Sequence, residues 1–122
     1  MITFPFKFPM KRRIIFHDLK MDIPVTTGYV ARYYDELMYI IYDAPFCLLY
    51  FVDKQLRVEA SLQSMINNLP KKIFFECSRP VIIHVDHCKE FNRTEAVVVM
   101  DDGRKFKISR RRIKDFIRKR YS

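Results

Sequence analysis

Short runs of apolar residues separated by turn signals dominate the chain. Residues 38–58 are rich in Tyr, Ile, Phe, Leu and Val, and Asp43-Ala44-Pro45 interrupts them. This composition, with a turn signal in the middle, predicts two strands joined in a hairpin. A second turn is expected at residues 53–55, before a short alternating strand at residues 56–59.

After residue 60 the apolar residues recur at helical spacing instead. Ser61 is suited to cap the N-terminus of this helix, and Pro70 ends it. The residues that form its apolar face are Leu62, Met65, Ile66 and Leu69. The pattern therefore predicts one short helix with a single buried face.

Two more strands are expected at residues 73–75 and 81–85. Residues 76–80 lie between them, and Pro80 favours a loop or an edge position there. Arg79 would then be exposed in this bend. Residues 1–21 are not assigned to an element, although residues 13–17 could add a strand.

The last third of the chain predicts a hairpin followed by a helix. Residues 97–100 and 105–108 flank Asp101-Asp102-Gly103, and a glycine accepts the positive φ of a tight turn without steric cost. Ser109 is a plausible N-cap for the final helix. Its expected apolar stripe consists of Ile113, Phe116, Ile117 and Tyr121.

Composition fits one domain with a hydrophobic core. The chain has 122 residues, 49% of them hydrophobic, and only two glycines. The longest apolar run, residues 37–52, contains Asp43 and Pro45 and is shorter than the roughly 20 residues that cross a bilayer. Residues 1–13 place their basic side chains after the apolar ones, the reverse of a secretory signal. A cytoplasmic protein without a membrane span is expected.

The three cysteines, Cys47, Cys77 and Cys88, lie in apolar stretches at irregular spacing, which favours free, reduced thiols. A zinc site built from Cys77, His84, His87 and Cys88 is not expected. In a strand the two histidines would point to opposite faces, and the chain has no paired CxxC or HxxxH spacing. No cofactor is predicted.

Charge is distributed unevenly along the chain. Residues 103–122 contain ten Lys or Arg and a single acid, Asp115, whereas residues 1–102 carry 13 basic and 13 acidic side chains. Arg110 and Arg111 would stand in the first turn of the last helix, where the helix dipole disfavours cations. A functional reason, binding to a polyanion, is therefore favoured over a solvated helix face.

Catalytic patterns are missing from the sequence. No nucleophile stands beside a base, no carboxylates are paired for acid–base chemistry, and two glycines are too few for a phosphate-binding loop. Asp101-Asp102 is explained by its turn. The chain is not expected to be an enzyme.

Several segments follow one another in a recognisable order. Residues 23–28 lead into Asp35-Glu36-Leu37-Met38-Tyr39-Ile40, and residues 56–69 combine a strand with a helix. Residues 73–86 form a strand pair, and a DG turn then precedes Ile108-Ser109-Arg110-Arg111. Over roughly residues 22–121 this order resembles the LytTR (LytR/AlgR-type) family of bacterial DNA-binding domains, with its "edI-x-Y-I", "F-x-R-x-H-R-S-Y-I-V-N" and "dG-x-x-x-x-iSRR" motifs.

The resemblance implies a mostly β (α+β) fold: an elongated stack of small antiparallel sheets with one short internal helix and a basic C-terminal helix. Members of this family insert loop side chains, rather than a recognition helix, into DNA grooves. The matching positions here would be Arg79 and Arg110, and arginine can bind guanine edges or phosphates with two hydrogen bonds. Three positions depart from the motif, namely Glu76, Ser78 and His84.

The sequence therefore predicts an N-terminal extension, residues 1–21, and a LytTR-like domain, residues 22–122. The first hypothesis is a transcriptional regulator that binds duplex DNA. The residues expected to contact DNA are Arg79, Arg104, Lys105, Lys107, Arg110, Arg111, Arg112 and Lys114. The alternative is a degenerate family member that serves as a protein-interaction module, either as a homodimer or as the partner of a regulatory protein. Tyr29, Tyr33 and Tyr34 would be its interface.

Overall fold

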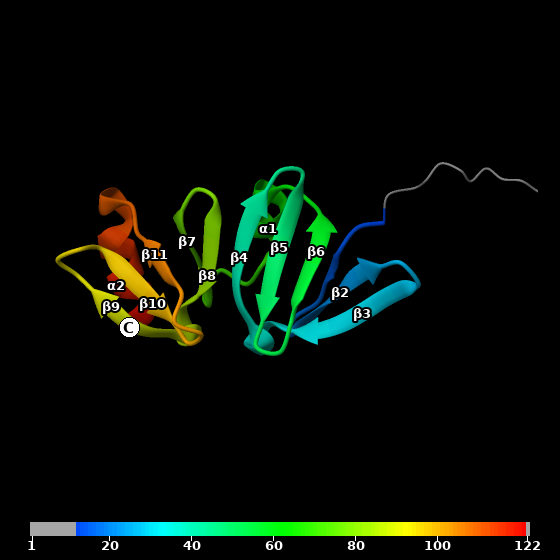
Figure 1. Ribbon diagram of the computed structural model, residues 1–122, viewed down its shortest axis with the longest axis horizontal. Helices are drawn as coiled ribbons and strands as arrows, with labels where there is room; N and C mark the ends of the chain where they lie inside the picture. Colours follow the sequence, from blue (N-terminus) through cyan, green and yellow to red (C-terminus); the bar gives the residue numbers. More distant parts are fainter. Residues whose placement is uncertain (1–11, 122) are drawn as a thin grey trace, which may run out of the picture.

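The computed structural model describes residues 12–121 and consists of three antiparallel sheets. Figure 1 shows them following one another along the long axis of the molecule. The expectation of a mostly β fold built from small sheets is confirmed. The prediction about a secretory signal in residues 1–13 concerns mostly residues outside the described range.

The N-terminal sheet contains β1 (Ile15–Phe16), β2 (Lys20–Val25) and β3 (Gly28–Tyr33), in that order. Strand β1 pairs with β2, so the possible extra strand near residues 13–17 is confirmed. Gly28 follows the turn between β2 and β3 with a φ of +146°, a conformation that glycine adopts most readily. The short 3-10 helix η1 (Tyr34–Glu36) then leads into the central sheet.

The central sheet has five strands in the order β6-β5-β4-β8-β7. They are β4 (Leu37–Asp43), β5 (Phe46–Phe51), β6 (Gln55–Glu59), β7 (Phe74–Ser78) and β8 (Val81–His84). The predicted hairpin is confirmed, because β4 and β5 pair up to the turn, where Asp43 lies opposite Phe46. Helix α1 (Leu62–Asn68) connects β6 to β7, and the Ser61 side chain accepts a hydrogen bond from the Ser64 backbone N–H, as expected of an N-cap.

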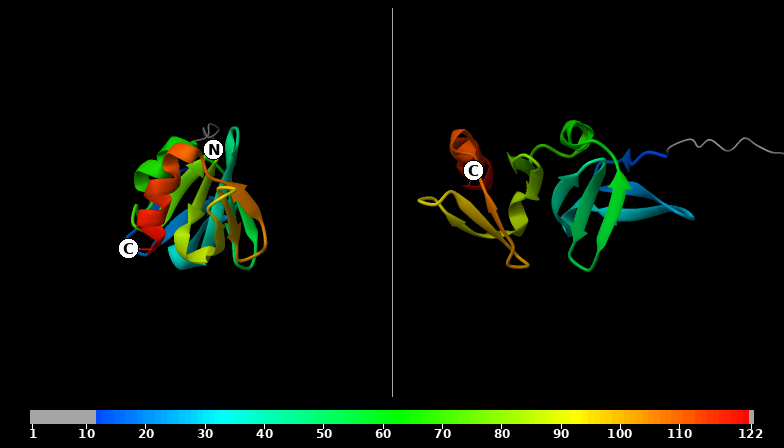
Figure 2. Two further views of the ribbon diagram at one scale, coloured as in Figure 1. Left: turned by 90° about the vertical axis from the view of Figure 1, so that its left-hand side faces the viewer. Right: turned by 45° about the horizontal axis from the view of Figure 1, so that its top comes forward.

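The C-terminal sheet contains β9 (Cys88–Asn92), β10 (Val97–Met100) and β11 (Lys105–Lys107). The 3-10 helix η2 (Val85–His87) leads into it from β8. Strands β10 and β11 form the predicted hairpin, with Gly103 at a φ of +90° in its turn. Helix η3 (Arg110–Arg112) and helix α2 (Ile113–Tyr121) follow, and Figure 2 shows α2 beside this sheet.

Two hydrophobic clusters lie on opposite faces of the central sheet. Ile40 and Ile82 belong to the first cluster, and the neighbouring residues Tyr39 and Ile83 belong to the second. This division follows from the two-residue period of strands, which sends successive side chains to opposite faces. The first cluster joins the N-terminal sheet and α1 to the central sheet. The second joins the C-terminal sheet and α2, where Phe116 is fully buried.

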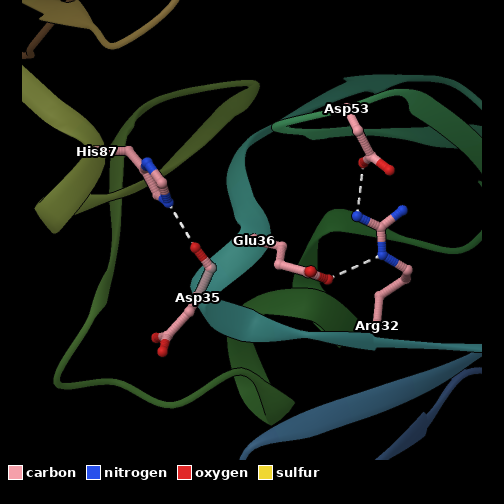
Figure 3. Close-up of polar contacts among 5 residues, drawn as sticks. All are labelled: Arg32, Asp35, Glu36, Asp53 and His87. Carbon is pink, nitrogen blue, oxygen red and sulfur yellow. Dashed lines mark hydrogen bonds and ion pairs between the residues drawn. The ribbon is translucent and has the colours of Figure 1, made fainter.

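A buried arginine connects the N-terminal sheet to the central sheet. Arg32, on β3, is only 8% exposed, and its guanidinium lies 4.2 Å above the Phe51 ring. Its Nε donates to Glu36 Oε1 at 3.0 Å and its Nη2 to Asp53 Oδ1 at 2.6 Å (Figure 3). Burial alone would lower the pKa of Arg32, but the hydrogen bonds with Asp53 and Glu36 raise it, so the charge is retained.

Four local expectations are wrong. Residues 76–78 continue strand β7, because their backbones pair with β8, so the bend is limited to Arg79 and Pro80. The Ser109 side chain makes no capping hydrogen bond. Tyr121, placed in the apolar stripe of the last helix, is 61% exposed because the helix ends there. Tyr34, expected at an interface, is 2% exposed in the core.

All three cysteines are free and buried, as expected. Burial raises the pKa of the Cys47 thiol to about 11 and that of Cys77 to about 12, and it also raises the pKa of Cys88. Between residues 12 and 121, no helix is long and apolar enough to cross a membrane.

Candidate nucleic-acid interface

The β7–β8 turn presents Arg79 at one edge of the central sheet. The turn is held from the neighbouring strand, because the Tyr42 N–H donates to the Pro80 carbonyl at 2.9 Å. Arg79 is exposed, and its guanidinium has no ion pair or hydrogen bond within residues 12–121. A structural ion pair with Glu76 or Asp86 is the alternative explanation for an arginine in this turn. Within residues 12–121 Arg79 forms neither pair, and Glu76 pairs with Arg112 instead.

The segment that leads from β11 into η3 is fixed beside the same turn. The buried Ile108 donates its N–H to the Ala96 carbonyl at 2.8 Å, and the Ser109 N–H donates to the Cys77 carbonyl at 3.0 Å. The second bond brings the start of η3 to the end of β7. In Figure 1 the β7–β8 turn and the β11–α2 connection both lie along the upper edge. Arg79 and Arg110, 31 positions apart in the sequence, therefore belong to one edge of the molecule.

Three consecutive arginines in η3 have different surroundings. Arg110 and Arg111 are exposed. Arg112 is half-buried: its Nη1 donates to the Glu76 carbonyl at 2.7 Å and lies 3.3 Å from Glu76 Oε1. This contact fixes η3 on β7 and neutralises the carboxylate that stands two residues before the turn. Local sequence pattern does not indicate this division, because the partner of Arg112 lies 36 residues away.

Strand β11 carries exposed basic side chains between these two ends. Lys105 and Lys107 are exposed, whereas Phe106 between them is partly buried and packs edge-on against Tyr39, with ring centroids 4.9 Å apart. Alternation along the strand therefore directs both lysines to the solvent face. Lys114, in the first turn of α2, is exposed as well.

Arg104 is exposed but rests on an aromatic platform. Its guanidinium lies 5.5 Å from the centroid of the Tyr50 ring and 5.8 Å from that of Tyr39, and these two rings stack at 4.6 Å. Tyr39 also donates its hydroxyl to Asp102 Oδ2 at 2.6 Å. Burial and then this carboxylate raise the pKa of Tyr39 to about 12, so it remains a hydrogen-bond donor. Sequence reasoning missed this platform, although the alternation of β4 and β5 placed both rings on one face.

The remaining cations of α2 contact the protein itself. Arg118 pairs with Asp115 at 2.8 Å, Lys119 donates to the carbonyl of Phe74, and Arg120 to that of Cys88. Burial lowers the pKa of Lys119. Apart from Arg112, the basic block at the end of the chain thus divides into free cations up to Lys114 and cations beyond it that contact the protein.

His84 and His87 lie close together, contrary to the expectation that they point to opposite faces. Their ring centroids are 5.0 Å apart, because the chain turns into η2 before His87. Among the described residues, no group of three or more His, Cys, Asp or Glu is placed to hold a metal ion.

Comparison with known proteins identifies a similar solved structure and a matching family. A search of curated proteins gave no match. Among solved structures, the chain is similar to the LytTr DNA-binding domain of a Bacillus cereus protein described as a methyl-accepting/DNA response regulator. The similarity covers 87% of this chain and all of that one, with a TM-score of 0.71 and 21% sequence identity, and it supports the fold.

The family model of the LytTr DNA-binding domain matches residues 29–120, which include most of β3, the central and C-terminal sheets and the free cations described above. This is a family of DNA-binding domains rather than of enzymes, in agreement with the lack of catalytic patterns in the sequence. The chain belongs to the LytTR family of DNA-binding domains.

Proposed function

We propose that this protein is a transcriptional regulator that binds duplex DNA along the edge formed by the β7–β8 turn, β11 and η3. One observation carries the proposal: Arg79, Arg110 and Arg111 are exposed without a protein partner in the described chain, on an edge fixed by the Ser109–Cys77 hydrogen bond. Exposed cations held on a rigid backbone suit the phosphates and base edges of a duplex.

Arg79 and Arg110 have a different proposed role from that of the other cations. Arg79 and Arg110 approach the grooves, because a guanidinium can bind a guanine edge with two hydrogen bonds. The residues proposed to contact phosphates are Arg104, Lys105, Lys107, Arg111 and Lys114. Arg112, expected from the sequence to contact phosphate, is proposed to act through Glu76 instead, by holding η3 in place.

The pairing of Arg112 with Glu76 bears on the alternative function. Glu76 stands where the family motif has an arginine, and an unpaired carboxylate there would repel phosphate. Because Arg112 lies 3.3 Å from that carboxylate, much of the repulsion is removed. Cys77 and Val81, on either side of the turn, are buried. The turn is therefore well packed, although Ser78 and His84 also depart from the family motif.

Selection from a random library of duplexes, at near-physiological salt, tests the proposal directly. A sequence-specific regulator should retain a short recurring element. Arg110→Ala should then weaken binding to that element more than binding to random duplex, whereas Lys105→Ala should weaken both equally. Equal losses from both variants on all sequences would contradict the groove contact of Arg110.

The protein-interaction alternative is favoured by one feature of the N-terminal sheet. Leu19 is 73% exposed, and Tyr33, which lies opposite the next residue, Lys20, in the β2–β3 pair, is 52% exposed. If no duplex is retained in the selection and the protein is a dimer by light scattering, this second function is supported. A monomer with salt-sensitive DNA affinity would count against it.

The division into an extension, residues 1–21, and a DNA-binding domain, residues 22–122, remains a proposal. Strand β1 lies within the extension and pairs with β2, and Met21 is fully buried. Removal of residues 1–21 is therefore expected to disturb the N-terminal sheet, and removal of residues 1–11 alone is the better test of DNA binding without the extension.

A further inference from the structure

His87 joins two parts of the molecule that are distant in the sequence. Its Nδ1 lies 2.8 Å from Asp101 Oδ2, in the β10–β11 turn. Its Nε2 lies 2.6 Å from the backbone carbonyl oxygen of Asp35, in η1, where the chain enters the central sheet (Figure 3). The His87 side chain is 17% exposed. One imidazole therefore bridges η1 to the β10–β11 turn.

Both groups that face the ring are hydrogen-bond acceptors. A backbone carbonyl never donates, and an ionised carboxylate only accepts. A neutral imidazole has one N–H and can donate to only one of these two acceptors. Its other, unprotonated nitrogen would then face the lone pairs of the second acceptor at close range. Both contacts are satisfied together only by an imidazolium, which donates from both nitrogens.

The groups around His87 are consistent with a positive charge at this position. Asp35 and Asp86 contribute carboxylates near the pair of histidines, in addition to Asp101. His84 does not compete for the charge: its Nδ1 accepts from the Asp86 N–H at 3.1 Å, and burial, followed by the neighbouring His87, lowers its pKa. The Cys88 thiol, next in sequence, stays neutral because burial raises its pKa.

We propose that His87 is a pH-sensitive clasp, which holds the β10–β11 turn against the central sheet when the imidazole is protonated and releases one of its two contacts when the proton is lost. The turn is otherwise held by the backbone hydrogen bond from Asp101 N–H to the His87 carbonyl and by the Tyr39–Asp102 contact. Loss of the proton therefore loosens the turn without unfolding it.

The clasp lies next to part of the proposed DNA edge. Asp102 accepts from the Arg104 N–H at 3.0 Å, and Lys105 follows in β11, so the position of the turn sets the position of both cations. Resting on the proposed function, the clasp makes DNA affinity depend on pH. Affinity falls when His87 is deprotonated.

Nuclear magnetic resonance of the wild-type protein tests the clasp itself. Nitrogen-15 spectra of the imidazole rings distinguish an imidazolium, whose two nitrogens are both protonated, from a neutral tautomer. The imidazolium spectrum of His87 is expected to persist to higher pH in the wild type than in Asp101→Asn, because that substitution removes the carboxylate at Nδ1. The same transition in both proteins would overturn the proposal.

Urea unfolding from about pH 6 to about pH 9 supplies the second measurement. The two contacts of a protonated ring exist only in the folded chain, so the proposal predicts that stability falls as pH rises. The midpoint should therefore decrease through the deprotonation of His87 in the wild type and change less in His87→Gln. Asp101→Asn, a surface substitution, should also flatten the profile, and it serves if His87→Gln folds poorly.

His17→Gln is the matched control. His17 also faces a carboxylate, that of Asp22 at 2.9 Å, but within residues 12–121 only one of its ring nitrogens has a polar partner. This variant should keep the wild-type profile, and a flattened profile would assign the effect to the wrong histidine.

DNA affinity is then measured over the same pH range at constant salt. Affinity that decreases with the deprotonation of His87 in the wild type, but not in His87→Gln, supports the coupling. Affinity that is independent of pH overturns the coupling. Lack of binding at every pH overturns both the coupling and the proposed function, while the spectra and unfolding profiles alone decide on the clasp.

Discussion

At the scale of single residues, the described chain is characterised by buried groups whose partners come from distant segments. Arg32 meets Asp53, 21 residues away, and Arg112 meets Glu76. The Arg32 guanidinium is removed from water and that of Arg112 partly so, and in both cases the protein supplies hydrogen bonds in place of water, which is the condition under which a buried charge is tolerated. These contacts connect segments that lie far apart in the sequence.

Arg32→Ala should lower the free energy of unfolding by about 1–3 kcal/mol, because it removes two charged hydrogen bonds and the contact with the Phe51 ring. The loss stays below that of a fully buried pair, since Glu36 and Asp53 remain hydrated at 43% and 62% side-chain exposure. Urea unfolding at neutral pH measures it.

The control for this prediction is Arg118→Ala. Arg118 also forms an ion pair, with Asp115, but its side chain is 70% exposed, so a change within about 0.5 kcal/mol is expected. Equal losses from both variants would show that burial of Arg32 contributes nothing.

The three thiols should be almost unreactive in the folded protein. With a pKa raised to about 11 by burial, only about one Cys47 thiol in a thousand is ionised at about pH 8, and fewer at Cys77. Alkylation with iodoacetamide, followed by mass spectrometry, should be slow in buffer and fast in urea. Rapid labelling of Cys47 or Cys77 under native conditions would contradict the burial of these side chains.

At the scale of elements, turn residues in the sequence predicted structure correctly where an element is held by contacts between residues close together in the sequence. The Asp43-Ala44-Pro45 turn and the Asp101-Asp102-Gly103 turn both lie where the pattern predicted them. The end of β7 was predicted to be a loop from its residue types. It forms a strand because its backbone pairs with β8. Ser109 has the residue type of an N-cap, but its N–H is used to join η3 to β7.

Ser61→Ala and Ser109→Ala test this distinction between a real and an apparent cap. The Ser61 hydroxyl accepts from Ser64 N at 3.0 Å, so its loss should cost about 1 kcal/mol of stability. Ser109→Ala should change stability by less than about 0.5 kcal/mol, because no capping bond is lost. Thermal or urea unfolding of the two variants side by side measures the difference. An equal loss in both would assign a capping role to Ser109.

At the scale of the whole molecule, the free cations form an extended edge rather than a compact patch. They run from the β10–β11 turn along β11 into η3 and the start of α2, and the three sheets are arranged in a row (Figure 1). A net charge of +9 on 122 residues adds a long-range attraction for a polyanion. The free cations lie on the C-terminal sheet and at the adjacent β7–β8 turn, so a duplex bound to them would contact that part of the molecule.

The salt dependence of DNA binding tests how many of these cations are engaged. Five phosphate contacts predict a slope of about −4.5 in a plot of log affinity against log salt concentration. Arg111→Ala should reduce that slope by about 1. Lys54→Ala, in the β5–β6 turn at the lower edge in Figure 1, should leave it unchanged. Equal changes in both variants would contradict the proposed edge.

The sequence by itself determined the fold class, most strand positions, the capped internal helix and the concentration of charge near the C-terminus. These features depend on local causes: the period of apolar residues, the conformations available at turns, and residue type. It also indicated the family, through the order of its segments.

Only the tertiary structure decided which charges are free. Arg110 and Arg112 are identical in type and two residues apart, yet one is exposed and the other is held by Glu76 across 36 residues of chain. In the same way, two acceptors from separate segments meet at His87. The physical reason is that hydrogen bonds and ion pairs act over a few ångströms in space, and the fold, not the sequence separation, sets those distances.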